Sequence, residues 1–340
     1  MRRPVPSLPL ALFRVAFGLL MFVSTLRFVL NGWVNDFYAV PQVHFPYLGF
    51  GWVKPLPEAG MYAVFALMTV STLLIAAGLF YRVSITGFFV LFTYTELIDK
   101  TYYLNHYYLV SLLSFLLIFL PLNRALSLDV RLGRLPAAAT VPAWTLYALR
   151  LQLVLVYVFA GIAKLNPDWL FDAQPLRIWL RANTELPVIG FLFDHLWSAY
   201  VMSWAGTLYD LCIPFLLLWR RARPFAYLIV VAFHLLTALL FPIGMFPWIM
   251  MVSTLVFFSL EDSRQVSSGR RFAEGFSPPT LKRSTCVVGI LSLFFLFQIG
   301  VSLRHFSYPG NVLWTEEGLP LFLAGDAGGK NGSRYVQGRR

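Results

Sequence analysis

The sequence predicts an all-α integral membrane protein, a polytopic bundle of about nine transmembrane helices with a cytoplasmic N-terminus. The first observation is composition: 58% of the 340 residues are hydrophobic and only 13% are charged. The mean hydropathy of +0.68 is too high for a soluble domain of this length. The second is that apolar runs of membrane-spanning length recur along the chain, and the third is where the basic residues fall between them.

A membrane-spanning helix needs about 20 apolar residues. The first run is longer than the apolar core of a signal peptide and no small-residue cleavage site follows it, so we expect it to remain as a span. The predicted spans are 8–30, 60–80, 83–98, 107–121, 144–163, 204–219, 224–241, 245–260 and 284–303.

The net charge of +11 indicates topology rather than nucleic-acid binding, because the basic residues form no single patch. Fourteen fall on one side of the predicted membrane, at positions 2, 3, 82, 124, 131, 134, 220, 221, 223, 264, 270, 271, 282 and 283. Up to the last span the other side has five, at positions 54, 100, 164, 177 and 181. The positive-inside rule therefore places the N-terminus in the cytoplasm.

The sequence contains none of the common soluble-enzyme motifs. There is no G-x-S-x-G, no Walker A sequence and no H-E-x-x-H. Cys212 and Cys286 lie inside apolar runs without a partner at metal-ligand spacing, so we predict no metal site.

A polar segment, "ELIDKTYYLNHYYL" (96–109), separates two apolar runs on the non-cytoplasmic side. Its tyrosines could form an aromatic belt at the level of the lipid headgroups. Alternatively, its polar side chains belong to a site, and His106, one residue into the next helix, is then the strongest candidate.

Lys164 ends the long apolar run in "YVFAGIAKLNPDW" (157–169). A lysine at a helix end can anchor in the headgroup region by extending its side chain to the interface. It can also act as a general base when burial disfavours its charged form. Both interpretations remain open from the residues alone.

Two further polar residues fall inside predicted spans. His234 precedes a break formed by Pro242, Gly244 and Pro247, and backbone irregularity of this kind is tolerated where protein or a cavity surrounds it. Asp210 must have a partner at membrane depth, and we expect an ion pair with Arg14 or Arg150, or a polar cavity.

The ordered motifs "DKTYYLNHYYL", "YVFAGIAKLNPDWL", "LYDL" and "FHLLTALLFPIGMFPW" resemble the HTTM domain of vitamin K-dependent gamma-glutamyl carboxylase and its bacterial relatives. "RHFSYPGNVLWTEEG" (304–318) resembles the segment after the last span of that domain. We therefore predict an HTTM-like transmembrane domain over residues 1–318 and a polar, disordered tail over 319–340.

The resemblance implies a reaction in which a lysine deprotonates a reduced naphthoquinone of the vitamin K or menaquinol type, which then reacts with O2 to give a strong base. That base removes a proton from a glutamate side chain, and the resulting carbanion takes up CO2. In this sequence the base corresponds to Lys164, and the histidine and asparagine of the site correspond to His106 and Asn105. The remaining site residues predicted are Tyr102, Tyr103, His234, Phe241 and Met245 for the quinol, and Tyr308, Gly310 and Trp314 for the acceptor.

Three features depart from the family pattern. Ala163-Lys164 replaces a pair of lysines, and Thr237 stands where an asparagine is expected. The full carboxylase carries a β-rich substrate domain after its last span, whereas 37 residues follow Leu303 here. The sequence thus resembles a short bacterial-type member.

The expected partners are an isoprenoid quinol in the lipid and either a glutamate-containing peptide or a separate substrate-recognition subunit. The expected location is a membrane, which is the cytoplasmic membrane if the protein is bacterial, with the site on the non-cytoplasmic face. The alternatives are a non-catalytic quinone- or lipid-binding protein or an accessory subunit. A transporter is disfavoured because the polar groups cluster on one face.

Overall fold

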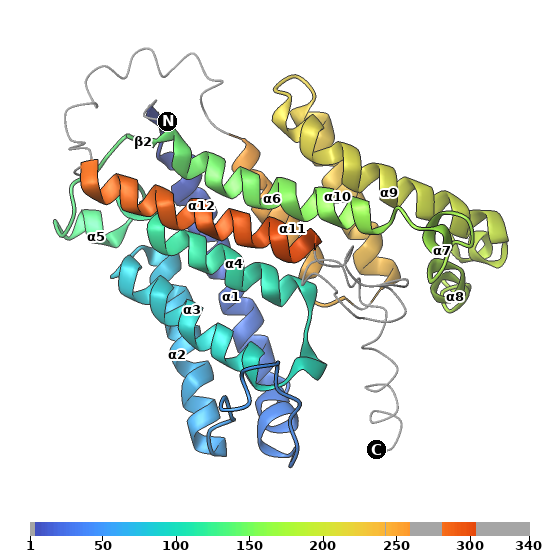
Figure 1. Ribbon diagram of the computed structural model, residues 1–340, viewed down its shortest axis with the longest axis horizontal. Coiled ribbons are helices and arrows are strands. Elements are labelled where there is room, and N and C mark those ends of the chain that lie inside the picture. Colours follow the sequence, from blue (N-terminus) through green and yellow to red (C-terminus); the bar gives the residue numbers. More distant parts are fainter. Residues whose placement is uncertain (1–3, 242, 259–280, 304–340) are drawn as a thin grey trace. The chain divides into compact units, whose positions relative to one another are not determined.

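The computed structural model describes residues 4–241, 243–258 and 281–303, and these are largely helical (Figure 1). The described part contains one two-stranded antiparallel sheet, in which β1 (Pro4–Pro6) pairs with β2 (Thr140–Pro142). The chain divides into two compact units, Met1–Arg150 with Trp248–Leu293 and Leu151–Pro247 with Phe294–Arg340. Helices α6 (Ala143–Ala163), α11 (Phe246–Thr254) and α12 (Leu281–Leu303) contribute residues to both units.

The first unit is built on four helices that pack in chain order, α1 against α2, α2 against α3 and α3 against α4 (Figure 1). They are α1 (Leu8–Leu30), α2 (Glu58–Ala77), α3 (Tyr81–Ile98) and α4 (Asn105–Phe119). Short elements complete it: η1 (Asn35–Ala39), η2 (Lys100–Tyr102), η3 (Leu122–Arg124), α5 (Leu128–Arg131) and η5 (Leu255–Phe257).

A close contact between α1 and α2 depends on Gly18. A Cβ added at Gly18 would lie 2.6 Å from the backbone nitrogen of Ala76 and 2.8 Å from its Cα. Small residues allow helix backbones to approach in membrane bundles, where packing rather than hydrophobic burial drives association. Gly18 therefore sets the separation of α1 and α2.

A buried polar cluster fixes the turn between α2 and α3. Gly78 ends α2 in the left-handed conformation, with φ of 67°. The guanidinium of Arg14, fully buried, donates hydrogen bonds to the carbonyl oxygens of Ala76 and Leu122, each at 3.3 Å, and to that of Leu126. Backbone carbonyls that a helix end leaves free are thus satisfied inside the protein.

Asp129 completes the same corner from α5. Its carboxylate accepts hydrogen bonds from the backbone N–H groups of Phe80 (2.9 Å) and Tyr81 (3.2 Å) and from the Asn123 amide (3.1 Å). Burial opposes the charge of Asp129, but these hydrogen bonds outweigh it and hold the pKa below its ordinary value.

The second unit contains the end of α6, the connection from α6 to α9, and the long antiparallel neighbours α9 and α10. Its elements are α7 (Pro167–Leu170), α8 (Leu176–Arg181), η4 (Gly190–Asp194), α9 (Leu196–Leu218) and α10 (Arg223–Leu240). Its apolar core joins the connection to the ends of α9 and α10 through Ala173, Leu176, Leu180, Phe193, Ala199 and Leu240.

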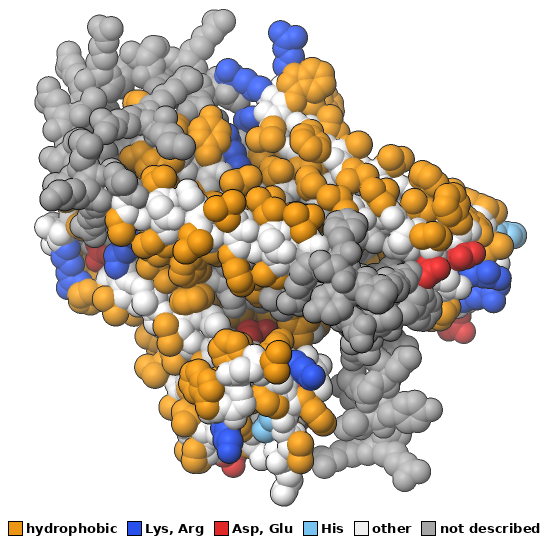
Figure 2. All heavy atoms as spheres, viewed as in Figure 1, with side chains coloured by type: hydrophobic (Ala, Val, Ile, Leu, Met, Phe, Trp, Pro, Cys, Tyr) orange, Lys and Arg blue, Asp and Glu red, His pale blue; other side chains and the backbone are white. Residues whose placement is uncertain are grey.

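Six described helices are long and apolar enough to cross a membrane: α1, α2, α6, α9, α10 and residues 286–303 of α12. Exposed leucines such as Leu67 on α2, Leu208 on α9 and Leu228 on α10 suit lipid contact. On the face drawn in Figure 2, apolar side chains cover much of the described helical surface. The expectation of an all-α, multi-pass membrane protein is therefore confirmed at this coarser level.

The predicted boundaries differ from the structure at two spans. The run expected at 204–219 begins earlier, because α9 extends back to Leu196 through aromatic and polar residues that lower the hydropathy but remain helical. The run expected at 245–260 forms only nine residues of α-helix, followed by a single 3-10 turn. The proposed tail at 319–340 lies outside the described residues.

Replacing Gly18 by alanine is expected to lower the free energy of unfolding by about 1–3 kcal/mol, as overpacking of a close contact does. The matched control is Gly206→Ala on α9, where an added Cβ meets no atom within 4 Å. Thermal unfolding of the purified protein in detergent measures both. Equal melting temperatures for the two variants would contradict the close-contact role of Gly18.

The lowered pKa of Asp129 gives its contribution to stability a defined pH dependence. Because the folded-state pKa is below the unfolded value of about 3.9, the contribution is complete above that value and is lost as pH falls through the folded pKa. The melting temperature of Asp129→Asn should therefore lie below that of the parent chain at pH 7, and the gap should shrink in acid. A gap that stays constant with pH, or an equal gap for the exposed control Glu58→Gln, would contradict this assignment.

Candidate functional site

The candidate site is built at the point where α6 ends. Lys164 directly follows Ala163, the last residue of that helix. Asn166 then caps α7: its Oδ1 accepts from the backbone N–H of Trp169 at 2.9 Å, and its Nδ2 donates to the carbonyl of Ala163 at 2.8 Å. The Asn-Pro-Asp-Trp sequence thus makes a sharp, doubly bonded turn that holds the lysine in place.

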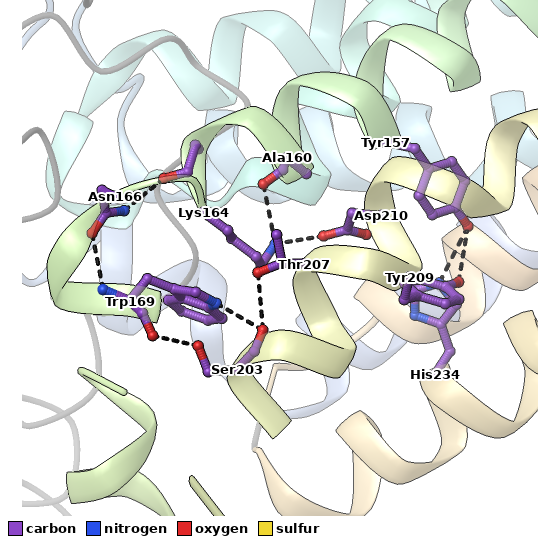
Figure 3. A network of polar contacts seen from close by, with 11 residues as sticks. Tyr157, Ala160, Lys164, Asn166, Trp169, Ser203, Thr207, Tyr209, Asp210 and His234 are labelled. Carbon is purple, nitrogen blue, oxygen red and sulfur yellow. Dashed lines mark hydrogen bonds and ion pairs between the residues drawn. The ribbon is translucent and has the colours of Figure 1, made fainter. Parts of the chain in front are cut away.

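The ammonium group of Lys164 lies 2.5 Å from Oδ2 of Asp210 on α9 (Figure 3). It also donates to the carbonyl oxygen of Ala160 at 3.3 Å and lies 5.5 Å from the centre of the Trp169 ring. The Asp210 side chain is 9% exposed and that of Lys164 is 23% exposed. This is a largely buried ion pair between two helices, with one aromatic face beside the cation.

Reciprocal hydrogen bonds fix the Trp169 ring against α9. The indole N–H donates to the carbonyl of Ser203 at 3.0 Å, and the Ser203 hydroxyl donates to the carbonyl of Trp169 (Figure 3). Close by, Gly161 lets α6 approach α9, since an added Cβ would lie 2.6 Å from the Leu211 side chain and 3.2 Å from its backbone nitrogen. The lysine, the aspartate and the ring are therefore positioned by packing as well as by charge.

A second polar cluster lies on α6, α9 and α10. The hydroxyls of Tyr157 and Tyr209 and Nε2 of His234 are all mutually 3.4 Å apart (Figure 3). His234 is 1% exposed, and its Nδ1 has no hydrogen-bond partner within the described part of the chain. Tyr157 lies two turns before Lys164 on α6, and Tyr209 directly precedes Asp210 on α9.

The polar segment after α3 belongs to the first unit. Asp99 accepts from the backbone N–H and the hydroxyl of Thr101, at 2.9 and 2.7 Å, and its other oxygen lies 3.3 Å from Nδ1 of His44. The Tyr103 hydroxyl donates to Oδ1 of Asn105 at 3.1 Å. His106 is buried in the first turn of α4, with its ring 4.6 Å from that of Tyr107.

The residues predicted for the site fall into three groups. The first unit contains Asn105, His106, Tyr103 and Tyr102, and the Tyr102 ring stacks on that of Phe37. The second unit contains Lys164, His234, the buried Met245 and Phe241, and the Phe241 ring packs on that of Trp179. Tyr308, Gly310 and Trp314 lie outside the described residues.

The partner expected for Asp210 was wrong. Asp210 pairs with Lys164, whereas Arg14 donates to the carbonyls around Gly78 and Arg150 donates to those of Val256 and Phe257. The expectation failed because it sought a partner inside another span, while the lysine at the end of α6 reaches back along its own helix. Both arginines instead satisfy backbone carbonyls.

Sequence reasoning also missed Tyr157, Tyr209 and Trp169. A signal was present for the first, because Tyr157 and Lys164 are seven residues apart and so lie on one face of a helix. Tyr209 carried no comparable signal, because its partners come from two other helices.

The Lys164–Asp210 pair can exchange a proton between Nζ and Oδ2 while the net charge of the pair stays zero. With Asp210 ionised and Lys164 protonated, the pair offers an ammonium donor next to an aromatic wall. With the proton on Asp210, Lys164 presents a free amine that can accept a proton from a weak acid bound beside it.

Residues 2–261 match the HTTM domain family. The chain belongs to the HTTM-domain family. The match covers Lys164, Asp210, His234 and the segment from Asp99 to His106, so both polar clusters lie within the HTTM domain. No solved structure matches this chain.

Removing one partner of the Lys164–Asp210 pair is expected to lower the free energy of unfolding of this HTTM domain more than removing both partners does. Lys164→Met or Asp210→Leu alone leaves a buried group without its partner, which costs about 3–5 kcal/mol in buried pairs. The double variant Lys164→Met/Asp210→Leu should recover part of that loss. Melting temperatures in detergent form the double-mutant cycle, with the exposed Lys54→Met as the control for loss of a lysine. Strictly additive effects would show that the two side chains do not interact.

Proposed function

We propose that this HTTM-domain protein is a quinol-dependent membrane enzyme of the gamma-glutamyl carboxylase type, in which Lys164 is the base. The observation that supports this most is the buried Lys164–Asp210 pair at the end of α6, with the indole of Trp169 beside the nitrogen. A quinol hydroxyl is a weak acid, so a base that removes its proton has to present a neutral amine in a poorly hydrated place. The pair meets that need without placing a net charge in the apolar surroundings.

Asp210 has a defined part in this proposal. A lysine paired with a carboxylate is stabilised as the ammonium, so Lys164 becomes a base only when its own proton moves to Oδ2 of Asp210. The amine then accepts the proton of the quinol hydroxyl. The bond between oxygen and hydrogen in the quinol breaks as one between hydrogen and Nζ forms, and the pair holds one proton more than before.

The surrounding side chains fit a flat aromatic headgroup. Aromatic rings lie around the polar groups of the second unit, and they belong to Trp169, Tyr157, Tyr209 and Phe233. The rings of Tyr209 and Phe233 stack with 3.8 Å between their centres. The open Nδ1 of His234 offers one further hydrogen-bonding position. Ligand sites of this kind combine apolar walls with a few convergent polar groups.

The remaining roles follow the family resemblance. That resemblance assigns His106 and Asn105 to orienting the quinol or the oxyanion. It assigns Tyr102, Tyr103, Phe241 and Met245 to the quinol, and Tyr308, Gly310 and Trp314 to the acceptor. The quinol, when bound, supplies the strong base through its reaction with O2, which ends in the epoxide, and the carbanion formed on a glutamate side chain takes up CO2. The domain extends to residue 318, crosses the membrane nine times with its N-terminus in the cytoplasm, and carries the site on the non-cytoplasmic face.

One observation favours a second function. A carboxylate 2.5 Å from Nζ also favours a permanently charged lysine, which is a hydrogen-bond donor and not a base. The protein would then bind a quinone or lipid headgroup without reacting, or assist a separate substrate-recognition subunit. Both functions use the same residues, so they differ in turnover and not in binding.

Epoxide formation separates the two functions. Purified protein in nanodiscs, given reduced vitamin K or menaquinol under O2, should form the epoxide, and Lys164→Ala should lower the rate by about 10²–10⁴-fold, the usual contribution of a general base. His106→Ala and Asp210→Asn should also lower it, while Lys54→Ala should not. Quinol binding is measured on the same samples by quenching of tryptophan fluorescence. Binding without epoxide would establish the non-catalytic function, and a folded protein that neither binds nor reacts would contradict both.

A further inference from the structure

A second polar site, away from Lys164, lies within the first unit. A cavity of about 20 Å³ opens between η1 and the helices α1 to α4. A cavity of this size holds about one water molecule. It is lined by Ser24, Thr25, Phe28, Tyr38, Phe65, Met68, Phe92, Thr95, Glu96 and Tyr107.

Aromatic rings form most of the apolar wall. Phe28 stacks on Phe65 with 4.7 Å between ring centres, and Tyr38 packs against both rings. Phe92 meets Tyr107 edge to face at 5.8 Å. The apolar part of the wall cannot solvate a charge, so a charge in this cavity would depend on the few hydroxyl groups that line it.

Glu96 is the acidic group of this cavity, and within the described residues it has neither a hydrogen bond nor an ion pair. No lysine, arginine or histidine lines the cavity. The phenols of Tyr38 and Tyr47 interact electrostatically with Glu96, and the phenol of Tyr107 also lines the cavity. Three residues further on, Asp99 is bonded to Thr101 and His44. An ionised Glu96 would thus be a negative charge in an apolar enclosure without a cation beside it.

The two threonine hydroxyls at the cavity act toward it as acceptors. The Thr25 hydroxyl donates to the carbonyl oxygens of Met21 (3.0 Å) and Phe22 (3.1 Å), and the Thr95 hydroxyl donates to that of Phe92 (2.8 Å). Each hydroxyl has one proton, so toward the cavity its oxygen offers lone pairs, one of which on Thr25 accepts from the Thr69 hydroxyl at 3.2 Å. A carboxylic acid or a water molecule can donate to a remaining lone pair, whereas a carboxylate cannot.

We infer that Glu96 is a proton-binding site: it is held as the neutral acid and shares the cavity with one water molecule, bonded to the hydroxyls of Thr25 and Thr95. The ligand is a proton together with water, and the site uses no residue of the Lys164 pair. It stands whether or not the proposed enzymatic function does. Ionisable side chains among membrane helices commonly carry protons in this manner.

Infrared difference spectroscopy tests the protonation directly. The full chain in nanodiscs at neutral pH should show the carbonyl stretch of a protonated carboxyl group, and Glu96→Gln, which keeps the shape and a donor, should remove that band without lowering the melting temperature. Thr95→Val should shift the band, because it removes an acceptor. Thr86→Val should not, since Thr86 is exposed on α3 and donates to the Arg82 carbonyl. Absence of the band from the folded parent chain would overturn the inference.

A hydrophobic carbodiimide gives an independent readout. Dicyclohexylcarbodiimide adds to a neutral acid as the acid proton moves to a carbodiimide nitrogen, so the peptide gains the whole reagent mass with no leaving group. Peptide mass spectrometry should find the adduct on Glu96 of the parent chain and of Glu58→Gln, and none at this position in Glu96→Gln. Protection by sodium ions, together with a missing carboxyl band, would instead identify a sodium site and contradict the proton site.

Discussion

Charged side chains placed among apolar helices must find their partners inside the protein, and this constraint organises both units. Arg14 is fully buried and bonds three backbone carbonyls at the corner between α2 and α3. Arg150 does the same for the carbonyls of Val256 and Phe257. In each case a cation satisfies backbone oxygens where helices end or break, so one side chain removes several unpaired groups at once.

The Lys164–Asp210 pair is a different solution to the same problem. Two opposite charges neutralise each other across α6 and α9, and Gly161 allows the helices to come close enough for the short side chain of Asp210 to reach the lysine. A pair of this kind gains little stability over an apolar contact, because removing both charges from water offsets their attraction. The proposed function gives the pair a role beyond stability, because it can hold and move a proton.

The Lys164–Asp210 pair and the Glu96 cavity differ in the way they avoid an unpaired buried charge. At Lys164 the charge is matched by a partner on a neighbouring helix. At Glu96 no cation lines the cavity, and the threonine hydroxyls present lone pairs, so a proton takes the place of the partner. Both sites therefore relate local geometry to proton chemistry, the first through an ion pair and the second through a neutral acid.

The sequence by itself determined the all-helical membrane class, because the length and hydropathy of a span are properties of consecutive residues. It also indicated the HTTM family, which the match over residues 2–261 confirms, and it identified Lys164 as a candidate from the apolar run and the turn that follows it. Only the tertiary structure decided that Asp210 pairs with Lys164 and not with an arginine, and that Tyr157 and Tyr209 meet His234. Such pairings join helices that are 25 to 77 residues apart in the chain, and helical periodicity does not determine which faces of distant helices will meet. The close helix contacts at Gly18 and at Gly161 could not be predicted for the same reason. Whether a helical glycine allows a close contact depends on which part of the chain packs beside it.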